Sequence, residues 1–397
     1  MGVVLPRDTS NPQPQSGRNR TLARNSDIQV HNIKAAVLRK RGGPLKIESL
    51  EMEGPRDDEV LVRIIASGIC HTDIDFCDYW DKAEGPLVLG HEGAGIVEEV
   101  GKKVKGVKHG NHVVLSYQSC GRCGQCRSGH PTDCERFYKA NFGFARLDGS
   151  NAYRRGVRGH FFGQSSFATH ALATERNLVK VSKRSNLEIL SPLGCGLQTG
   201  AGTVMNSLKV AKGASIAVFG TGAVGLAAVM AARIVGADPI IGVDIRPKRL
   251  KLALELGATH VIDNRRNETA SLIADMTGSG VDYVVETTAN QKMHALAVDV
   301  LNPHGTVALL TGESGTTLPE GRRTIGIIQG DAVPQIFIPK LIALYKAGKF
   351  PFDRLVRFYD FSKINAAIAD AKSGGTIKPV LRIGNEQVRE VKGGAAD

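Results

Sequence analysis

Residues 193–235 read L-G-C-G-L-Q-T-G-A-G-T-V-M-N-S-L-K-V-A-K-G-A-S-I-A-V-F-G-T-G-A-V-G-L-A-A-V-M-A-A-R-I-V, and this stretch decides the fold. Its centre is an apolar run, residues 215–219, followed by a glycine-rich turn and an alanine-rich run over residues 224–235. A strand, a G-x-G-x-x-G turn and a helix in this order let the backbone approach a pyrophosphate, and the N–H groups at the helix start bind the anion. We therefore expect a dinucleotide site at Gly220, Gly222, Ala223, Val224 and Gly225.

An acidic residue closes the next apolar run. Asp244 follows residues 239–243 and comes nineteen positions after Gly225, counted from 225 to 244. In this context an acid at about this distance binds the ribose 2′-hydroxyl of NAD. The alternative is a glycine turn in an α/β domain that binds no nucleotide. Asp244 favours the NAD interpretation.

The bulk composition excludes several classes of protein. The chain has 397 residues, 42% of them hydrophobic, which is enough for a core and for two or three domains. The net charge of +12 raises the alternative of a nucleic-acid partner, but basic and acidic residues are interleaved along the chain. We therefore expect no nucleic-acid partner. The surplus of positive charge favours the binding of anionic cofactors instead. No apolar run approaches the roughly 20 residues that span a bilayer, so we expect no membrane association.

The N-terminal segment has a different composition from the rest of the chain. Residues 1–32 are rich in Asn, Gln, Ser, Pro and Arg, which predicts a disordered tail. The start, M-G-V-V-L-P-R-D, contains no apolar core of signal-peptide length. We therefore expect a cytoplasmic protein.

Four of the seven cysteines form a cluster that reads C-G-R-C-G-Q-C-R-S-G-H-P-T-D-C. An odd cysteine count without a signal peptide argues against a disulfide framework. The C-x2-C-x2-C-x7-C spacing lets a short loop wrap four thiolates around one tetrahedral ion, and we expect a structural zinc. Iron–sulfur ligation is the chemical alternative. The expected ligands are Cys120, Cys123, Cys126 and Cys134.

Hydrophobic patterning divides the chain. Short alternating segments separated by Gly-Pro turns follow residue 33 and predict an antiparallel barrel or sandwich, with another β-like stretch at residues 161–173. After Cys195, about six apolar strands alternate with helix-like runs, which predicts a doubly wound parallel sheet. The expected divisions are a tail (1–32), a catalytic domain (33–194) with a cysteine lobe (120–134), a nucleotide domain (195–335) and a returning C-terminal part (336–397).

Five motifs together resemble a known family, the zinc-dependent medium-chain alcohol dehydrogenases. They are C-H-T-D (70–73), G-H-E-G-A-G-I-V-E-E-V-G (90–101), the cysteine lobe, G-C-G-L-Q-T-G-A-G (194–202) and G-T-G-A-V-G (220–225). The segments F-F-G-Q-S-S-F-A, V-P-Q-I-F-I-P-K-L and G-K-F-P-F-D resemble the aryl (benzyl) alcohol dehydrogenase branch. The resemblance implies an α/β fold, a GroES-like β-barrel catalytic domain plus a Rossmann doubly wound parallel sheet. It also implies NAD-linked conversion of a small-molecule alcohol and its aldehyde by a homo-oligomer, a dimer or a tetramer.

The resemblance implies a catalytic zinc on Cys70, His91 and Cys195, in addition to the structural zinc of the lobe. Two thiolates, an imidazole and an open fourth position are typical of catalytic zinc. Thr72 would pass the substrate proton outward, and Asp73 would hold the His91 ring. Glu92 would lie near the zinc. The alternatives are a capping hydroxyl for Thr72 and an ordinary salt bridge for Glu92.

Other positions bear on the cofactor and the substrate. Many relatives have Arg at His71 for the pyrophosphate and a relay histidine at Asp75, while Lys378 lies where relatives place a basic residue on the pyrophosphate. Cys77 matches no ligand position and is interpreted as packing. Trp80 ends an aromatic segment, residues 76–80, that we expect near the substrate channel, where rings favour planar substrates. The alternative is that these rings pack in the barrel core.

We therefore expect an NAD-dependent zinc alcohol dehydrogenase that acts on primary, aryl or allylic, alcohols. Zinc-free reductases of the same fold lack this ligand set. Polyol and other secondary-alcohol dehydrogenases are closer, but they tend to have Glu where this chain has Cys195. A non-catalytic nucleotide-binding structural protein is the alternative from a different class.

Overall fold

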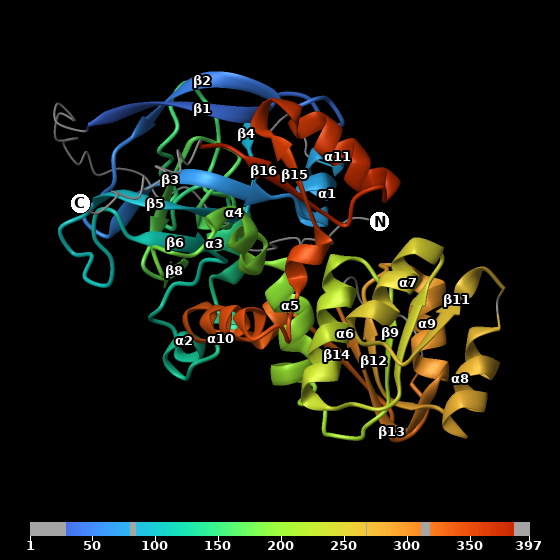
Figure 1. Cartoon of the computed structure of the whole chain (residues 1–397). Coiled ribbons are helices and arrows are strands. Elements are labelled where there is room, and N and C mark those ends of the chain that lie inside the picture. The colour runs from blue at the N-terminus through green and yellow to red at the C-terminus, as the bar shows by residue number, and fades with distance from the viewer. Residues whose placement is uncertain (1–28, 80–84, 267, 311–317, 385–397) are drawn as a thin grey trace, which may run out of the picture.

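The computed structural model describes residues 29–79, 85–266, 268–310 and 318–384 (Figure 1). Trp80 and residues 1–28 of the expected tail lie outside the described residues. Strand β1 (Val30–Leu38) begins three positions before the barrel start that the sequence predicted at residue 33. Within the described residues, no helix combines the length and the apolar character needed to cross a bilayer.

The catalytic unit is built on two sheets, one of them seven-stranded. That sheet runs β15-β16-β3-β5-β6-β8, and β7 also pairs with β3. The smaller sheet runs β2-β1-β4. Nearly all of β3 is buried, because it lies in the middle of its sheet. The strands besides β1 are β2 (Lys46–Glu53), β3 (Glu59–Gly68), β4 (Leu87–Val88), β5 (Glu92–Val100), β6 (His112–Leu115), β7 (His170–Thr174), β8 (Leu178–Val181), β15 (Val356–Asp360) and β16 (Lys378–Arg382).

The nucleotide unit is a six-stranded parallel sheet in the order β11-β10-β9-β12-β13-β14. Chain order therefore reverses between β9 and β12, and ligands of doubly wound sheets bind at such a reversal. This order confirms the predicted Rossmann fold. The strands are β9 (Ile216–Phe219), β10 (Ile240–Asp244), β11 (His260–Asp263), β12 (Val281–Glu286), β13 (Leu301–Leu309) and β14 (Arg323–Gly326). The helices are α6 (Ala223–Val235), α7 (Pro247–Leu256), α8 (Thr269–Thr277) and α9 (Gln291–Asp299).

Short helices carry the turns of the catalytic unit. Helix α1 (His71–Tyr79) follows β3 directly, and its residue Asp73 accepts a hydrogen bond from the backbone N–H of Cys70 (3.0 Å). A carboxylate that reaches back to the residue before a helix stabilises the helix start. The other helices are α2 (Gly124–Arg127), α3 (Phe137–Phe142), α4 (Leu187–Leu190), α5 (Gly196–Gly202), α10 (Pro334–Lys346) and α11 (Ile364–Ser373).

The C-terminal segment returns to the catalytic unit. Figure 1 shows β15, β16 and α11, drawn in red, beside β3 and α1, drawn in blue. Strand β16 pairs antiparallel with the end of β3, with Val380 opposite Gly68. This pairing brings Lys378 next to the turn that carries Cys70, because β3 ends at Gly68.

The predicted β-like stretch at residues 161–173 is only partly a strand. Phe161–Gly163 forms a 3₁₀ turn, and β7 begins at His170. Phe162 and Ser165 have left-handed φ angles of 52° and 56°, which a strand does not tolerate. The Ser165 hydroxyl accepts from the Phe161 N–H and donates to the Val88 carbonyl. These bonds compete with a strand ladder.

Candidate metal centre and cofactor site

Four side chains converge on one point of the catalytic unit. Cys70, His91, Glu92 and Cys195 each offer a ligand atom, and these atoms all lie within 4.8 Å of one another. Cys70 stands between β3 and α1, His91 immediately precedes β5, Glu92 begins β5, and Cys195 precedes α5. His91 and Glu92 are fully buried and Cys195 is 7% exposed, so the group lies inside the protein.

Asp73 fixes the orientation of the His91 ring. His91 Nδ1 lies 2.9 Å from Asp73 Oδ1, and both side chains are fully buried. The same carboxylate accepts from the N–H groups of Cys70 and Gly90 (3.0 Å each). His91 Nε2 is buried and has no hydrogen-bond partner among the described residues. A buried imidazole nitrogen beside two cysteine sulfurs fits the donor set of a zinc ion.

The members of this group shift one another's pKa values, and the hydrogen bond to Cys70, together with burial, raises the pKa of Cys195 well above its usual range. The hydrogen bond from Cys195 holds the pKa of Cys70 well below its usual range, against the effect of burial. The thiolate is the form of cysteine that binds metals. Burial disfavours a charged His91, but the Asp73 carboxylate outweighs burial and raises the pKa of His91 to about 10. A metal therefore displaces a proton from His91 when it binds.

Glu92 is tied to the centre by a buried lysine. Lys378 Nζ lies 2.9 Å from both carboxylate oxygens of Glu92 and donates to the Ile69 carbonyl (3.2 Å). Burial disfavours the ammonium, but Glu92 outweighs it and raises the pKa of Lys378. Glu92 also accepts from the N–H of Gly196 (3.1 Å). The family resemblance implied a pyrophosphate contact for Lys378 and gave no sign of these contacts.

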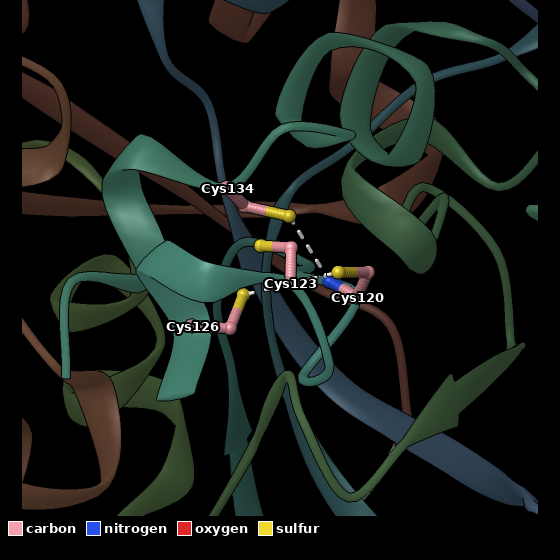
Figure 2. A group of neighbouring side chains, drawn as sticks. All are labelled: Cys120, Cys123, Cys126 and Cys134. Carbon is pink, nitrogen blue, oxygen red and sulfur yellow. Dashed lines mark hydrogen bonds between the residues drawn. The ribbon is translucent and has the colours of Figure 1, made fainter. Parts of the chain in front are cut away.

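The cysteine lobe forms a second group of ligands. Figure 2 shows Cys120, Cys123, Cys126 and Cys134 with their sulfur atoms turned toward one another, and these atoms lie within 4.8 Å of one another. The Cys134 sulfur accepts from the N–H groups of Cys120 (3.3 Å) and Arg136 (3.4 Å). Burial opposes ionisation of Cys120, but backbone N–H groups outweigh it and lower the pKa of Cys120 to about 6. Four sulfurs in this arrangement fit a closed tetrahedral zinc site.

The glycine-rich turn lies at the end of β9, beside the reversal of strand order. Gly220 has a φ of 86°, and a Cβ there would lie 2.5 Å from the Thr287 hydroxyl. Helix α6 starts with Ala223 and Val224, and a Cβ at Gly225 would overlap the Gly220 carbonyl. A side chain at either glycine would therefore disrupt the turn. The N–H groups of Gly220 and Thr221 are bonded to Val243 and Asp244, so an anion would bind to the N–H groups at the start of α6.

Asp244 ends β10 next to this turn. Its Oδ2 accepts from the Thr221 N–H (2.7 Å) and hydroxyl (2.9 Å), and its Oδ1 accepts from the N–H groups of Ile245 and Arg246. The side chain is 8% exposed. The carboxylate is thus held rigidly at the edge of the nucleotide site.

The remaining predicted positions surround the metal group. The Thr72 hydroxyl lies 3.9 Å from the Cys70 sulfur, and His71 is exposed at the start of α1. Burial raises the pKa of Asp75, which lies one helical turn after His71. Cys77 is buried, and burial raises its pKa to about 12, which agrees with a packing role.

Two groups of neighbours were missed from the sequence. Gln329 Nε2 donates to the Cys195 sulfur at 3.4 Å, although 134 residues separate the two in the chain. No sequence signal marks Gln329, because the contact depends on how the loop after β14 folds back. The second group is aromatic: the Phe162 ring stacks on the His91 ring with centroids 4.3 Å apart, and Phe142 and Phe161 pack edge-on against Phe162. The repeated Phe at 161 and 162 was a signal that could have found it.

Comparison with known proteins agrees with this architecture. Residues 56–183 match the alcohol dehydrogenase GroES-like domain, and residues 223–329 match the zinc-binding dehydrogenase domain. The chain is 44% identical to a geraniol dehydrogenase of Castellaniella defragrans over 88% of this chain and 97% of that protein. The chain therefore belongs to the zinc-dependent medium-chain alcohol dehydrogenases.

Solved structures extend the comparison. An alcohol dehydrogenase zinc-binding domain protein from Burkholderia ambifaria is 49% identical, with a TM-score of 0.86 over 90% of this chain and 100% of that one. A benzyl alcohol dehydrogenase from Acinetobacter calcoaceticus is 44% identical, with a TM-score of 0.86 over 89% of this chain and 100% of that one. The protein is an oxidoreductase acting on CH–OH groups, and its family implies zinc and an NAD-type cofactor.

Proposed function

We propose that this enzyme interconverts primary aryl or allylic alcohols and their aldehydes with NAD, using one catalytic and one structural zinc per chain. The observation that carries the proposal is the buried His91 Nε2, which lacks a partner among the described residues and lies beside Cys70 and Cys195. A buried polar atom without a partner is costly, and a metal ligand bond removes that cost.

Cys70, His91 and Cys195 would hold the catalytic zinc, with Glu92 close by, and the lobe cysteines would hold the structural zinc. When bound, the catalytic ion supplies Lewis acidity toward the substrate oxygen, and NAD supplies the hydride acceptor. Asp73 keeps His91 in its ligand tautomer through the Nδ1 hydrogen bond. His91, Glu92 and Cys195 are buried away from bulk water, while Cys70 is partly exposed.

Thr72 would take the proton of the substrate hydroxyl and pass it outward. Its hydroxyl stands 3.9 Å from the Cys70 sulfur, within reach of a group held at the metal centre. His71, which is exposed, and Asp75, which is half-buried, flank Thr72 on the first turns of α1, so a proton leaving Thr72 meets ionisable groups. Lys378 balances the charge of Glu92, which lies among the metal ligands.

The glycine turn and the start of α6 would bind the pyrophosphate, at Gly220, Gly222, Ala223, Val224 and Gly225. His71 and Lys378 would approach the pyrophosphate from the catalytic side, with the charge of Lys378 balanced by Glu92. Asp244 would accept the ribose hydroxyls, since its carboxylate is held at the end of β10 beside the turn. A carboxylate there repels the 2′-phosphate of NADP, so NAD is the expected cofactor.

Two observations support an aryl or allylic substrate. Two of the relatives described above are named for their alcohols, as a geraniol dehydrogenase and a benzyl alcohol dehydrogenase. Phe161 and Phe162 pack against the His91 ring and Phe142 packs against Phe162, and aromatic walls favour planar groups through stacking. Trp80 remains part of the hypothesis, although it lies outside the described residues. We also propose a homo-oligomer, a dimer or a tetramer.

The test measures NADH formation with benzyl alcohol, geraniol and ethanol, before and after treatment with a zinc chelator. We expect kcat/KM to be higher for the first two alcohols than for ethanol, and activity to be lost with the catalytic zinc. Activity that survives complete zinc removal would contradict the metal centre. A preference for ethanol would contradict the substrate class and leave the metal centre intact.

A further inference from the structure

The side chain of Gln329 makes a hydrogen bond to one of the candidate metal ligands. Its Nε2 lies 3.4 Å from the Cys195 sulfur, within hydrogen-bond range for sulfur. Gln329 belongs to the loop that follows β14, the last strand of the nucleotide sheet, and is 8% exposed. The nucleotide unit therefore reaches directly to a thiol of the catalytic unit.

A chain of hydrogen bonds orients the Gln329 amide. Gln198 Nε2 donates to the Gly194 carbonyl (2.8 Å), which can only accept. The same nitrogen donates to Gln329 Oε1 (2.9 Å), so the Gln329 oxygen must face Gln198. The Gln329 nitrogen is then the atom that faces Cys195. Gln198 is fully buried, so this arrangement is shielded from water.

The backbone that carries Gln329 is also held in an unusual conformation. Gln329, Gly330 and Asp331 have successive φ angles of 55°, 65° and 48°, all in the left-handed region. Residues other than glycine are strained in this region, and they persist there where the surroundings determine their conformation. The Gly330 carbonyl accepts from Asn206 Nδ2 (3.1 Å), and its backbone packs against Gly202. These contacts hold the strained loop, residues 329–331, against the helical segment that follows Cys195.

We propose that Gln329 is a positioning residue that tunes the Cys195 thiolate through this N–H···S hydrogen bond. The inference rests on the proposed metal centre, because it concerns how strongly Cys195 donates to the ion. An N–H donor withdraws electron density from a ligand sulfur, as neighbouring donors do for other metal-bound groups. The loop after β14 thereby sets the strength of one metal ligand from the nucleotide side.

The test uses protein loaded with cadmium-113 and compares wild type with Gln329→Met, which keeps the side-chain length and removes the donor. Cadmium bound by four thiolates and cadmium bound by two thiolates and an imidazole give separate NMR resonances. We expect the two-thiolate resonance of Gln329→Met to move downfield, because Cys195 donates more strongly without its hydrogen bond. The lobe resonance should stay in place.

Two further variants make the result decisive. Gln335→Met removes a glutamine of α10 that donates only to the backbone carbonyls of residues 175, 176 and 178, and it should leave both resonances unchanged. Gln329→Asn suits the left-handed backbone but is too short to reach the sulfur, and it gives the same readout if Gln329→Met does not fold. A two-thiolate resonance that is present but unmoved in the Gln329 variants overturns the inference and leaves the proposed function standing. Absence of that resonance in wild type overturns the metal centre itself.

Discussion

Lys378 and Glu92 form a buried ion pair, with Lys378 Nζ 2.9 Å from both carboxylate oxygens and side chains that are 3% and 0% exposed. Removal of one partner of a buried pair leaves the other charge uncompensated. We expect Lys378→Met to lower the free energy of unfolding by about 3–5 kcal/mol, measured by urea denaturation.

Two controls accompany this variant. The double variant Lys378→Met with Glu92→Gln should recover part of the loss, because no charge is then left unpaired. Lys372→Met breaks an exposed ion pair with Asp78 and should cost about 1 kcal/mol or less. Equal losses in the free energy of unfolding for Lys378→Met and Lys372→Met would show that the buried pair contributes no more to stability than the exposed pair.

The lobe cysteines could be proposed as metal ligands from the sequence because their spacing is read locally, whereas Cys70, His91 and Cys195 were assigned from the family resemblance. The four lobe cysteines lie within fifteen residues, counted from 120 to 134, and the glycine turn lies between a strand and a helix. The contacts of Lys378 and Gln329 could not be predicted, because they depend on the β16–β3 pairing and on a folded loop. The turn at Phe162 was missed because its left-handed backbone interrupts an apolar run that otherwise looks like a strand.

The two cysteine groups should separate stability from turnover. We expect Cys126→Ser to lower the thermal midpoint, because the lobe loses one of four thiolates that hold its loop together. We expect Cys195→Ser to abolish turnover with little change in the thermal midpoint. Zinc content measured by elemental analysis should fall from two ions to one in each variant. A fully active wild-type preparation that contains one zinc per chain or none would contradict both expectations.

Asp244 should control the choice of cofactor. Its carboxylate is fixed by Thr221 and by the N–H groups that follow β10, so it cannot swing away from a 2′-phosphate. We expect wild type to favour NAD over NADP by at least about tenfold in kcat/KM, or ~1.4 kcal/mol. Asp244→Asn should lower the ratio of kcat/KM with NAD to kcat/KM with NADP. Asp275→Asn, at an exposed site on α8, is the matched control and should leave the ratio unchanged.

His160 should make the protein less stable in acid. Burial, reinforced by the positive charge of Arg146, lowers the pKa of His160 to about 3, and its Nε2 accepts from the Ala152 N–H. The unfolded chain has a histidine pKa of about 6.5, so between these values only the unfolded state binds the proton. The contribution of His160 to stability is therefore complete above about pH 6.5 and is lost as the pH falls toward about 3.

The loss amounts to about 2 kcal/mol between about pH 6.5 and pH 5, at ~1.4 kcal/mol per pH unit. We expect the free energy of unfolding of wild type to fall by this much more than that of His160→Asn over the same interval. Asparagine suits the left-handed φ of 62° at this position. Parallel pH dependences for the two proteins would show that His160 takes up its proton in the folded state.

Phe162 should contribute to the preference for aryl substrates. Its ring stacks on His91 with centroids 4.3 Å apart, which places it against a candidate metal ligand. Stacking on an aromatic group is worth about 0.5–1.5 kcal/mol beyond area burial. We therefore expect Phe162→Leu to lower the ratio of kcat/KM for benzyl alcohol to that for ethanol by about 2- to 10-fold.

Phe358→Leu is the matched control, because Phe358 lies on β15 against Arg382. The ratio of kcat/KM for benzyl alcohol to that for ethanol in this variant should equal the wild-type ratio. An unchanged ratio in Phe162→Leu would mean that this ring only packs against His91, and the aromatic argument for the substrate would then rest on Phe142 and Phe161.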